Sequence, residues 1–329
     1  MSDLTPIHNP HLVGHDDAMQ QVAEAFASGR MHHAWMIAGI EGIGKTTLAY
    51  HIAQHVLSGG DNPIGKLNMN HRVAKLITAE AHPDMLVVRR ATDDKTGELR
   101  NVIVVDDALK IASFLHKTST HGGWRVVIID EAHALNRHGQ NAILKILEEP
   151  PARVLILITV TTPGALLPTI RSRCRVLQLA PLDAAHMKNI LMRSAMDLAP
   201  NDMDKLIGLS RGSIGFALKI LRTETLPLFE ELLALLSGAT LDTPRLHKLA
   251  DQISRKADAE SFDVVRSLLI EHLRQAARDL ALETNPAYRI NGKIQLWDRV
   301  RVTFGMADTG NLDRKLALIN AVNDIRSAA

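Results

Sequence analysis

A glycine-rich loop between two apolar segments is the feature that most limits what this chain can fold into. The loop reads Gly39-Ile-Glu-Gly-Ile-Gly-Lys45-Thr46 and matches the pattern G-x-x-x-x-G-K-[ST]. Before it, AWMIA (34–38) predicts a short buried strand, and after it an apolar stripe from Leu48 to Val56 predicts a helix. A strand, a glycine-rich loop and a helix in this order are typical of a phosphate-binding loop, or P-loop.

Each residue type in the loop suits one part of a nucleoside triphosphate. The glycines let backbone N–H groups curl around the β-phosphate, Lys45 would reach the β- and γ-phosphates, and the Thr46 hydroxyl would occupy a Mg²⁺ coordination position. The alternative is a glycine-rich turn that happens to precede a lysine, and the flanking strand and helix favour phosphate binding. The candidate nucleotide-binding residues are Gly39, Gly42, Gly44, Lys45, Thr46 and Thr47.

A second apolar segment ends in two acidic residues and could complete such a site. VVIID (126–130), followed by Glu131, predicts a buried strand with both carboxylates at its C-terminal end. Asp130 would hold the water shell of Mg²⁺, and Glu131 would polarise an attacking water molecule. Alone, the pair could equally be a surface turn, but the P-loop upstream favours a site. Thr161, just past the next strand, is the candidate probe of the γ-phosphate, although an isolated threonine there is more often a satisfied turn residue.

Strands and helices alternate through the first half of the chain. Further strands are predicted within 82–90, at 154–159 and at 175–179, and helices after Asp16 or Asp17 (either of which could cap the helix), at 105–119 and at 140–151. This alternation predicts a parallel sheet covered on both faces. After residue 183 only helical patterns follow. We therefore predict an α/β nucleotide-binding domain at 1–181, a small helical lid at 182–224 and an α-helical C-terminal oligomerisation domain at 225–329.

Composition excludes several classes of protein. Thirty-eight basic residues against 36 acidic ones give a net charge of +2, so contact with nucleic acid must come from a local patch or an assembly. The single cysteine excludes a disulfide framework and fits a reducing cytosol. The longest apolar run, Val154–Val160, is too short to span a bilayer, and the N-terminus lacks a signal pattern. We therefore expect a cytoplasmic protein with no membrane partner.

The segments around these motifs resemble a known family. GRMHHAWMIAGIEGIGKTTLA (29–49), HPDMLVV (82–88), GGWRVVIIDEAHALNRHGQNAILKILEEPP (122–151) and LLPTIRSRCRVLQLAPL (166–182) are similar to the clamp-loader subunits of bacterial DNA polymerase III, AAA+ proteins, and most of all to the delta prime type. The resemblance covers most of residues 9–220. It implies an AAA+ P-loop core, ATP and Mg²⁺ as cofactors, and other clamp-loader subunits (gamma/tau and delta) as partners, with the sliding clamp contacted indirectly and primed DNA within the assembly.

The resemblance also assigns a role to the arginine-rich stretch around the cysteine. In clamp loaders the Ser-Arg-Cys triplet, here Ser172-Arg173-Cys174, carries an arginine finger. This implies that Arg173 reaches the γ-phosphate of ATP bound by a neighbouring subunit, where a guanidinium neutralises charge on the transferred phosphate. Cys174 has no activating base apparent in the sequence, so we expect a small buried residue there.

The chain departs from its relatives in ways that leave two functions open. Some relatives have a degraded P-loop, whereas Lys45 and Asp130-Glu131 are intact here, which favours a gamma/tau-like motor subunit with its own ATP turnover. Gly215 stands where the motor subunits carry an arginine that senses the γ-phosphate. This favours a structural delta prime subunit of the polymerase holoenzyme, a nucleotidyltransferase complex, with at most weak ATPase of its own. We expect the second function.

The remaining candidates for metal or nucleotide binding are weaker. Residues 58–82 contain no cysteine where many delta prime proteins carry a four-cysteine zinc module, so we predict no zinc site. His51 and His55 lie four residues apart on the P-loop helix without a third ligand, and solvated helix histidines are expected. The segment Leu12–His15 would pack near the adenine, as in the family, or simply lead into a helix.

Overall fold

The computed structural model describes residues 5–92, 100, 102–116, 119, 122–194, 198–255, 259–281, 287–308, 310 and 312–328. The chain divides into two compact units, Met1–Gly215 and Phe216–Ala329. The three-part division with boundaries at 182 and 225 remains an interpretation of the sequence.

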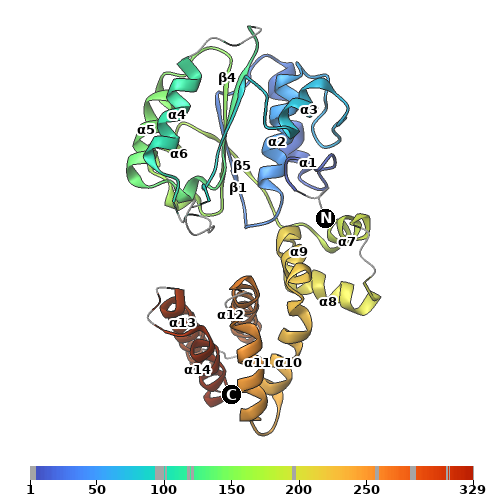
Figure 1. The fold of residues 1–329 in the computed structure, drawn as a ribbon, viewed down its shortest axis with the longest axis vertical. Helices are drawn as coiled ribbons and strands as arrows, with labels where there is room; N and C mark the ends of the chain where they lie inside the picture. The colour runs from blue at the N-terminus through green and yellow to red at the C-terminus, as the bar shows by residue number, and fades with distance from the viewer. Residues whose placement is uncertain are drawn as a thin grey trace. The chain divides into compact units, whose positions relative to one another are not determined.

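Five parallel strands form a single sheet in the first unit (Figure 1). The strands are β1 (Ala34–Ala38), β2 (Met85–Val88), β3 (Arg125–Ile129), β4 (Val154–Val160) and β5 (Arg175–Gln178), in the spatial order β2-β3-β4-β1-β5. Every neighbouring pair is parallel. β1, β3 and β4 are buried along their whole length, which explains their continuously apolar sequences. The predicted parallel sheet is confirmed.

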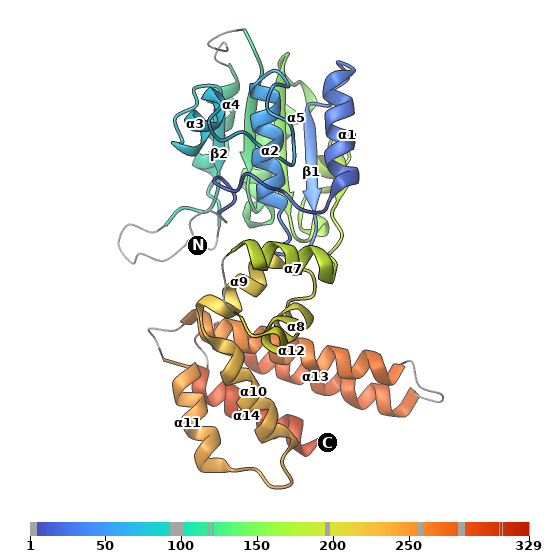
Figure 2. The same ribbon diagram turned by 90° about the vertical axis from the view of Figure 1, so that its right-hand side faces the viewer.

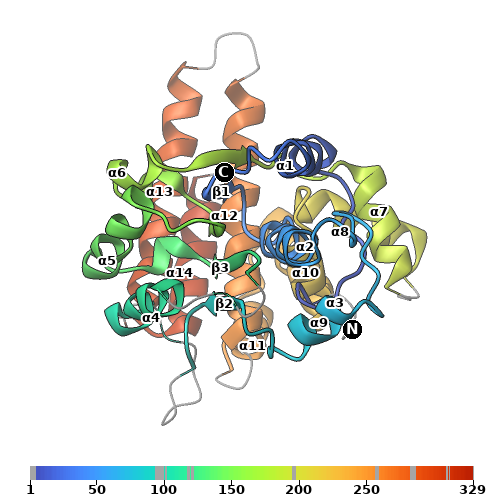
Figure 3. The ribbon, with the colours of Figure 1, turned by 90° about the horizontal axis from the view of Figure 1, so that it is seen from above.

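Helices cover both faces of the sheet (Figures 1 and 3). One face carries α1 (Asp16–Ala27), α2 (Lys45–Leu57) and α3 (Arg72–Thr78), and the other carries α4 (Val105–His116), α5 (Arg137–Glu148) and α6 (Pro168–Arg171). Alternate strand residues point to opposite faces, so Trp35 packs toward α2 whereas Met36 packs toward α5. The α/β core expected from the sequence, a parallel sheet with helices on both faces and a glycine-rich loop after β1, is confirmed. Residues 117 and 118, predicted to extend α4, lie outside the described residues.

Regular structure after β5 is helical wherever the chain is described. The helices are α7 (Ala184–Arg193), α8 (Pro200–Ser210), α9 (Ile214–Arg222), α10 (Thr225–Ser237), α11 (Thr243–Ile253), α12 (Ala259–Ala281), α13 (Ala287–Asp308) and α14 (Arg314–Ser327). In the second unit α12 and α13 lie side by side (Figures 2 and 3) and are joined by an edge-to-face contact of Phe262 with Phe304. The expected helical segments are confirmed. Over the described residues, no helix combines the length and apolarity needed to cross a membrane.

The start of α1 differs from the prediction. Its N-cap is His15, which has a left-handed backbone (φ 62°) and makes no side-chain capping bond. The predicted cap by Asp16 or Asp17 is therefore wrong. Both aspartates lie instead in the first turn, where their charge interacts favourably with the helix dipole. The His15 ring hydrogen-bonds the carbonyl oxygen of Ile43 at 2.9 Å, which ties the start of α1 to the P-loop.

His51 is a structural residue, so the expected solvated histidine is wrong. Its side chain is fully buried. Nε2 donates to the carbonyl oxygen of Asn9 at 2.9 Å, and Nδ1 accepts the N–H of Gly65 at 3.0 Å. Both ring nitrogens are thus used by the neutral imidazole. Burial lowers the pKa of His51 to about 4. His55 is half-buried and bonds the carbonyl oxygen of Asn62 at 3.0 Å.

A fully buried amide holds the segment that follows α2. Asn62 accepts the N–H of Asn68 at 2.7 Å and donates to Gln54 Oε1 at 3.3 Å. Hydrogen bonds from amides and imidazoles therefore fix the stretch for which no zinc site is predicted. Within the described ranges, no group of three or more His, Cys, Asp or Glu side chains is placed to hold a metal ion. The absence of zinc stays a prediction.

His51 should make the stability of the fold depend on pH. Its folded pKa of about 4 lies below the ordinary value of 6.5, so the unfolded chain binds the proton first as the pH falls. Stability is full above pH 6.5 and decreases toward pH 4 by up to about 3 kcal/mol. Denaturant unfolding at several pH values should show a weaker pH dependence in His51→Gln.

His138→Gln, at an exposed position on α5, is the matched control and should keep the wild-type pH dependence. If His51→Gln loses stability with acid as steeply as the wild type does, His51 is not the group that titrates.

Candidate functional site

The P-loop joins the C-terminal end of β1 to the N-terminus of α2. Gly42 and Gly44 have φ angles of 76° and 106°, in the left-handed region that other residues avoid. Gly44 is the N-cap of α2, so the loop delivers its backbone N–H groups to the positive end of a helix. The backbone of the loop therefore favours glycine at positions 42 and 44.

Lys45 lies beneath the loop with its ammonium group folded back on the main chain. Nζ donates to the carbonyl oxygens of Gly39 and Ile40 at 2.9 and 2.7 Å, and lies 3.5 Å from Thr161 Oγ1. Burial lowers the pKa of Lys45, an effect that the carboxylate of Asp130 opposes. A phosphate entering the loop would compete with the two carbonyl groups for the same protons.

Asp130 joins the P-loop helix to two strands. Its Oδ1 accepts the hydroxyl of Thr46 at 2.7 Å and that of Thr159 at 2.6 Å. The Thr159 oxygen in turn accepts the N–H of Glu131 at 2.9 Å. Hydroxyl bonds to an ionised carboxylate are short and strong. We refer to Thr46, Asp130, Thr159 and Glu131 as the Asp130 network.

Thr159 is a member of the Asp130 network that the sequence analysis missed. It lies on β4 and is fully buried. The sequence analysis treated it as part of the apolar run VLILITV. A polar residue within such a run was the available signal, because a buried hydroxyl needs hydrogen-bond partners.

Glu131 is held by its backbone and by an ion pair. It has a left-handed conformation (φ 54°, ψ 49°) and is the N-cap of the short helix η2 (Ala132–Ala134). Its carboxylate accepts Nε of Arg90 at 2.6 Å. Arg90 follows β2 and was not singled out in the sequence analysis, because nothing in the sequence indicates which carboxylate it meets. The ion pair restrains the position of the carboxylate.

Gly215 lies against the P-loop. Its N–H donates to the carbonyl oxygen of Gly42 at 2.8 Å, and Ser213 Oγ donates to the carbonyl oxygen of Glu41 at 2.7 Å. A Cβ atom at position 215 would lie 2.7 Å from Gly42 Cα. Glycine is therefore needed for the close approach of two main chains, which the sequence analysis, concerned only with a missing arginine, did not anticipate.

Arg173 lies outside the Asp130 network. It follows α6, where one terminal nitrogen donates to the carbonyl oxygen of Thr169 at 2.9 Å and the other pairs with Glu148 at 2.8 Å. Cys174 is half-buried, and burial raises the pKa of its thiol to about 12. A protonated thiol is a poor nucleophile. The sequence analysis expected a small buried residue here, and the side chain is half-buried and packs against the core.

The structure thus brings Lys45, Thr46, Asp130 and Thr161 together around one edge of the sheet, with Glu131 adjoining. Thr47, also predicted to bind nucleotide, is buried in the first turn of α2. Mg²⁺ prefers hard oxygen ligands, and a hydroxyl and a carboxylate are present. The individual roles of these residues stay predictions.

Described residues of the first unit line at least two hollows. One, of about 340 Å³, is lined by residues 14–18, 178–183 and His186, at the N-terminus of α1. Because His15 bonds the P-loop, the segment Leu12–His15 lies beside the loop, and packing against adenine remains a prediction for it.

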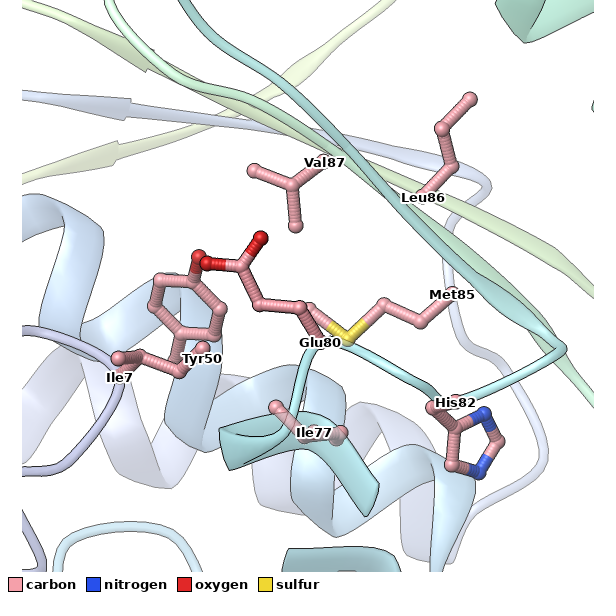
Figure 4. A pocket seen from close by; sticks show the side chains of 8 residues that line it. All are labelled: Ile7, Tyr50, Ile77, Glu80, His82, Met85, Leu86 and Val87. Carbon is pink, nitrogen blue, oxygen red and sulfur yellow. The ribbon is translucent and has the colours of Figure 1, made fainter.

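The second hollow, of about 230 Å³, lies at the β2 edge of the sheet (Figure 4). Apolar side chains form most of its wall, and the Tyr50 and Glu80 oxygens approach each other in this view. Burial raises the pKa of Tyr50 to about 12. The lining residues are Ile7, Tyr50, Ile77, Glu80, His82, Met85, Leu86 and Val87, none of which belongs to the P-loop or the Asp130 network.

Comparison with known proteins finds similarity to subunits of DNA polymerase III. A family model described as "DNA polymerase III, delta subunit" matches residues 14–183. DNA polymerase III subunit delta' of Pseudomonas aeruginosa is 31% identical over 81% of this chain and 70% of its own length. Subunit delta' of Escherichia coli is 31% identical over 61% of this chain, which spans 58% of that relative.

Gamma subunits are similar as well. Subunit gamma of Buchnera aphidicola is 28% identical over 64% of this chain and 56% of its own length. Among solved structures, a gamma subunit-related protein of Thermotoga maritima has a TM-score of 0.48 at 17% identity, covering 94% of this chain and 99% of that one.

Removing the Thr159 hydroxyl should destabilise the fold. Thr159→Val keeps the shape of the side chain but leaves the N–H of Glu131 without its acceptor and removes one of the two hydroxyl donors to Asp130. An unsatisfied buried group costs about 1–3 kcal/mol, so the free energy of unfolding should fall by that amount in denaturant titration.

Thr161→Val is the control, because among the described residues that hydroxyl is hydrogen-bonded only to Lys45, at a long distance of 3.5 Å. Equal stability of the two variants would mean that the Asp130 network does not support the fold.

Proposed function

Since the chain belongs to the DNA polymerase III delta-subunit family, we propose that it serves as the delta prime subunit of a clamp loader. In this role it would help an ATP-dependent assembly to load a sliding clamp onto primed DNA. The proposed partners are the other clamp-loader subunits (gamma/tau and delta), with the clamp contacted indirectly. Two curated relatives named delta' at 31% identity support this role. We propose that the protein acts in the cytoplasm.

ATP with Mg²⁺ is the proposed ligand of the P-loop. The supporting observation is the donor set at one edge of the sheet: the Lys45 ammonium group, the Thr46 hydroxyl and the Asp130 carboxylate. Lys45 would bind the β- and γ-phosphates, Thr46 would coordinate Mg²⁺, and Asp130 would hold the water shell of the ion. Bound Mg²⁺ would neutralise charge on the phosphates.

The observation that carries the delta prime role is the separation of two elements. The Asp130 network contains both the P-loop hydroxyl and the acidic pair within this chain. Arg173 lies outside that network, and 34% of its side chain is exposed. An arginine near the surface could reach a nucleotide held by another subunit, and an arginine supplied in trans makes hydrolysis depend on assembly.

Two contacts support slow turnover in the chain's own site. The pair with Arg90 restrains the carboxylate of Glu131, the proposed base, and competes with an attacking water molecule for it. Gly215 contacts Gly42 directly, where an arginine side chain could not enter without displacing the main chain. Both favour a subunit that binds nucleotide but hydrolyses it slowly.

The second candidate is a gamma/tau-like motor subunit. It is favoured by the intact Lys45, Asp130 and Glu131 and by the 28% identity to a gamma subunit. The rate of ATP turnover in this chain's own site separates the two candidates.

We expect the isolated chain to bind ATP·Mg²⁺ and Lys45→Ala to lose that binding. The ammonium group makes charge-assisted hydrogen bonds to phosphate, and their loss should weaken affinity at least about tenfold. Equilibrium titration with a fluorescent ATP analogue measures this. Lys75→Ala, at an exposed position on α3, should bind as the wild type does. Absence of binding by the wild type at saturating nucleotide would refute the proposed site.

Arg173→Ala should depress clamp- and DNA-stimulated ATP hydrolysis in the assembled loader, while the variant's own nucleotide affinity stays unchanged. An arginine finger contributes about 10³-fold or more at the site it completes, and other sites in the ring would mask part of this loss. Cys174→Ser is the matched control, because a thiol whose pKa is about 12 takes no part in chemistry at neutral pH. A dead serine variant beside a normal Arg173→Ala would reverse the assignment.

A further inference from the structure

The guanidinium group of Arg173 is already engaged within its own chain. One terminal nitrogen pairs with Glu148 Oε1 at 2.8 Å, and the other donates to the carbonyl oxygen of Thr169 at 2.9 Å. A guanidinium grips phosphate through paired N–H groups of its planar fork. Each terminal nitrogen of the proposed finger therefore already has a partner within its own chain.

The neighbouring arginines are placed differently. Arg175 lies over the ring of Trp35, with its guanidinium carbon 4.8 Å from the ring centroid. Arg171 is exposed, and its side chain makes no hydrogen bond or ion pair with the described part of the chain. Of the three arginines in residues 171–175, Arg173 is thus the one that pairs with a carboxylate in the described part of the chain. A high local density of charge does not explain this pairing, because Arg171 and Arg175 share that density.

Glu148 is well placed to attract an arginine. It is the last residue of α5, where the helix dipole presents its negative end. A carboxylate there is unfavourable alone, and a cation beside it offsets both the charge and the dipole. The next residue, Glu149, is also exposed, but its side chain makes no hydrogen bond or ion pair with the described residues, so it provides a matched comparison.

We propose that Glu148 masks Arg173 in the free chain and is displaced when a neighbouring subunit presents a nucleotide phosphate. The proposal rests on the proposed role of Arg173 as a finger in trans. The mask would keep an exposed arginine from binding free anions before assembly. It would leave the guanidinium close to the surface where a neighbour docks.

The strength of the pair suits a reversible mask. The two side chains are 34% and 48% exposed, so solvent screens their attraction. Ion pairs of this kind shift an equilibrium by about five-fold at most. A triphosphate with Mg²⁺ carries several oxygen acceptors and can form a bidentate contact, which is stronger than a single exposed pair. Assembly can therefore release Arg173 without a large energetic cost.

The mask can be tested in the free, full-length chain through the chemical reactivity of its arginines. Phenylglyoxal modifies exposed guanidinium groups, and mass spectrometry of peptides gives a rate for each arginine. In Glu148→Gln, Arg173 should react about two- to five-fold faster than in the wild type. In Glu149→Gln it should react at the wild-type rate. Arg171 is the internal reference, and its rate should not change in any variant.

Equal reactivity of Arg173 in the wild type and in Glu148→Gln would overturn the proposal, and so would a comparable acceleration in Glu149→Gln. An altered rate at Arg171 would show that the fold itself had changed. In that case Glu148→Asp, which keeps the charge on a shorter side chain, must protect Arg173 more than Glu148→Gln does for the proposal to stand.

ATP hydrolysis by the assembled loader gives the second measurement. A loader containing Glu148→Gln should hydrolyse ATP as fast as the wild type or up to about five-fold faster, with the larger effect at low ionic strength. A loss of activity approaching that of Arg173→Ala would mean that Glu148 supports the active state, which contradicts a mask. If Arg173→Ala itself hydrolyses normally, the finger role fails, while the reactivity of the free chain still decides whether Glu148 covers Arg173.

Discussion

Two hydroxyl groups that converge on one carboxylate oxygen join the parts of this α/β core. Thr46 belongs to the P-loop helix, Thr159 to β4, and both donate to Oδ1 of Asp130 at the end of β3. Because parallel strands present their carboxyl ends at the same edge of a sheet, groups far apart in sequence meet there. The Thr159 oxygen also fixes the N–H of Glu131 and therefore helps to set where that carboxylate can lie.

The chain from Glu131 to Glu148 connects the Asp130 network with the partner of Arg173. Glu131 caps η2, after which Asn136 caps α5 by accepting the N–H of Gly139 at 2.8 Å. At 1.5 Å per residue, α5 is about 18 Å long. Its far end carries Glu148, which holds Arg173. One continuous segment, from Glu131 to Glu148, therefore runs from the proposed nucleotide site to the residue that pairs with the proposed finger.

The sequence predicts those features that depend on local pattern. Continuous apolar runs predicted β1, β3 and β4. Strands covered by helices on both faces bury every side chain, so their sequences are apolar throughout. The P-loop was predictable because its backbone requires glycines at fixed spacing. The cap of α1 was misassigned because His15 takes a left-handed conformation that composition does not indicate.

What could not be predicted depends on tertiary placement. Arg90 is one of two adjacent arginines, and only the sheet order brings it to Glu131. His51 was expected in solvent, but residues 9 and 65 enclose its ring. The sequence analysis identified Gly215 as a position where motor subunits carry an arginine. Its close packing against Gly42 depends on the tertiary structure. In each case the partner is distant in sequence.

We propose above that this P-loop binds ATP·Mg²⁺, and a crystal structure of the chain with both ligands tests this binding most directly. We predict that Lys45 Nζ leaves the carbonyl oxygens of Gly39 and Ile40, now 2.9 and 2.7 Å away, for the phosphate oxygens. Thr46 Oγ1 should then lie about 2.1 Å from Mg²⁺ while it still donates to Asp130. A loop without nucleotide at saturating ATP, with Lys45 still bonded to both carbonyl groups, would contradict the account.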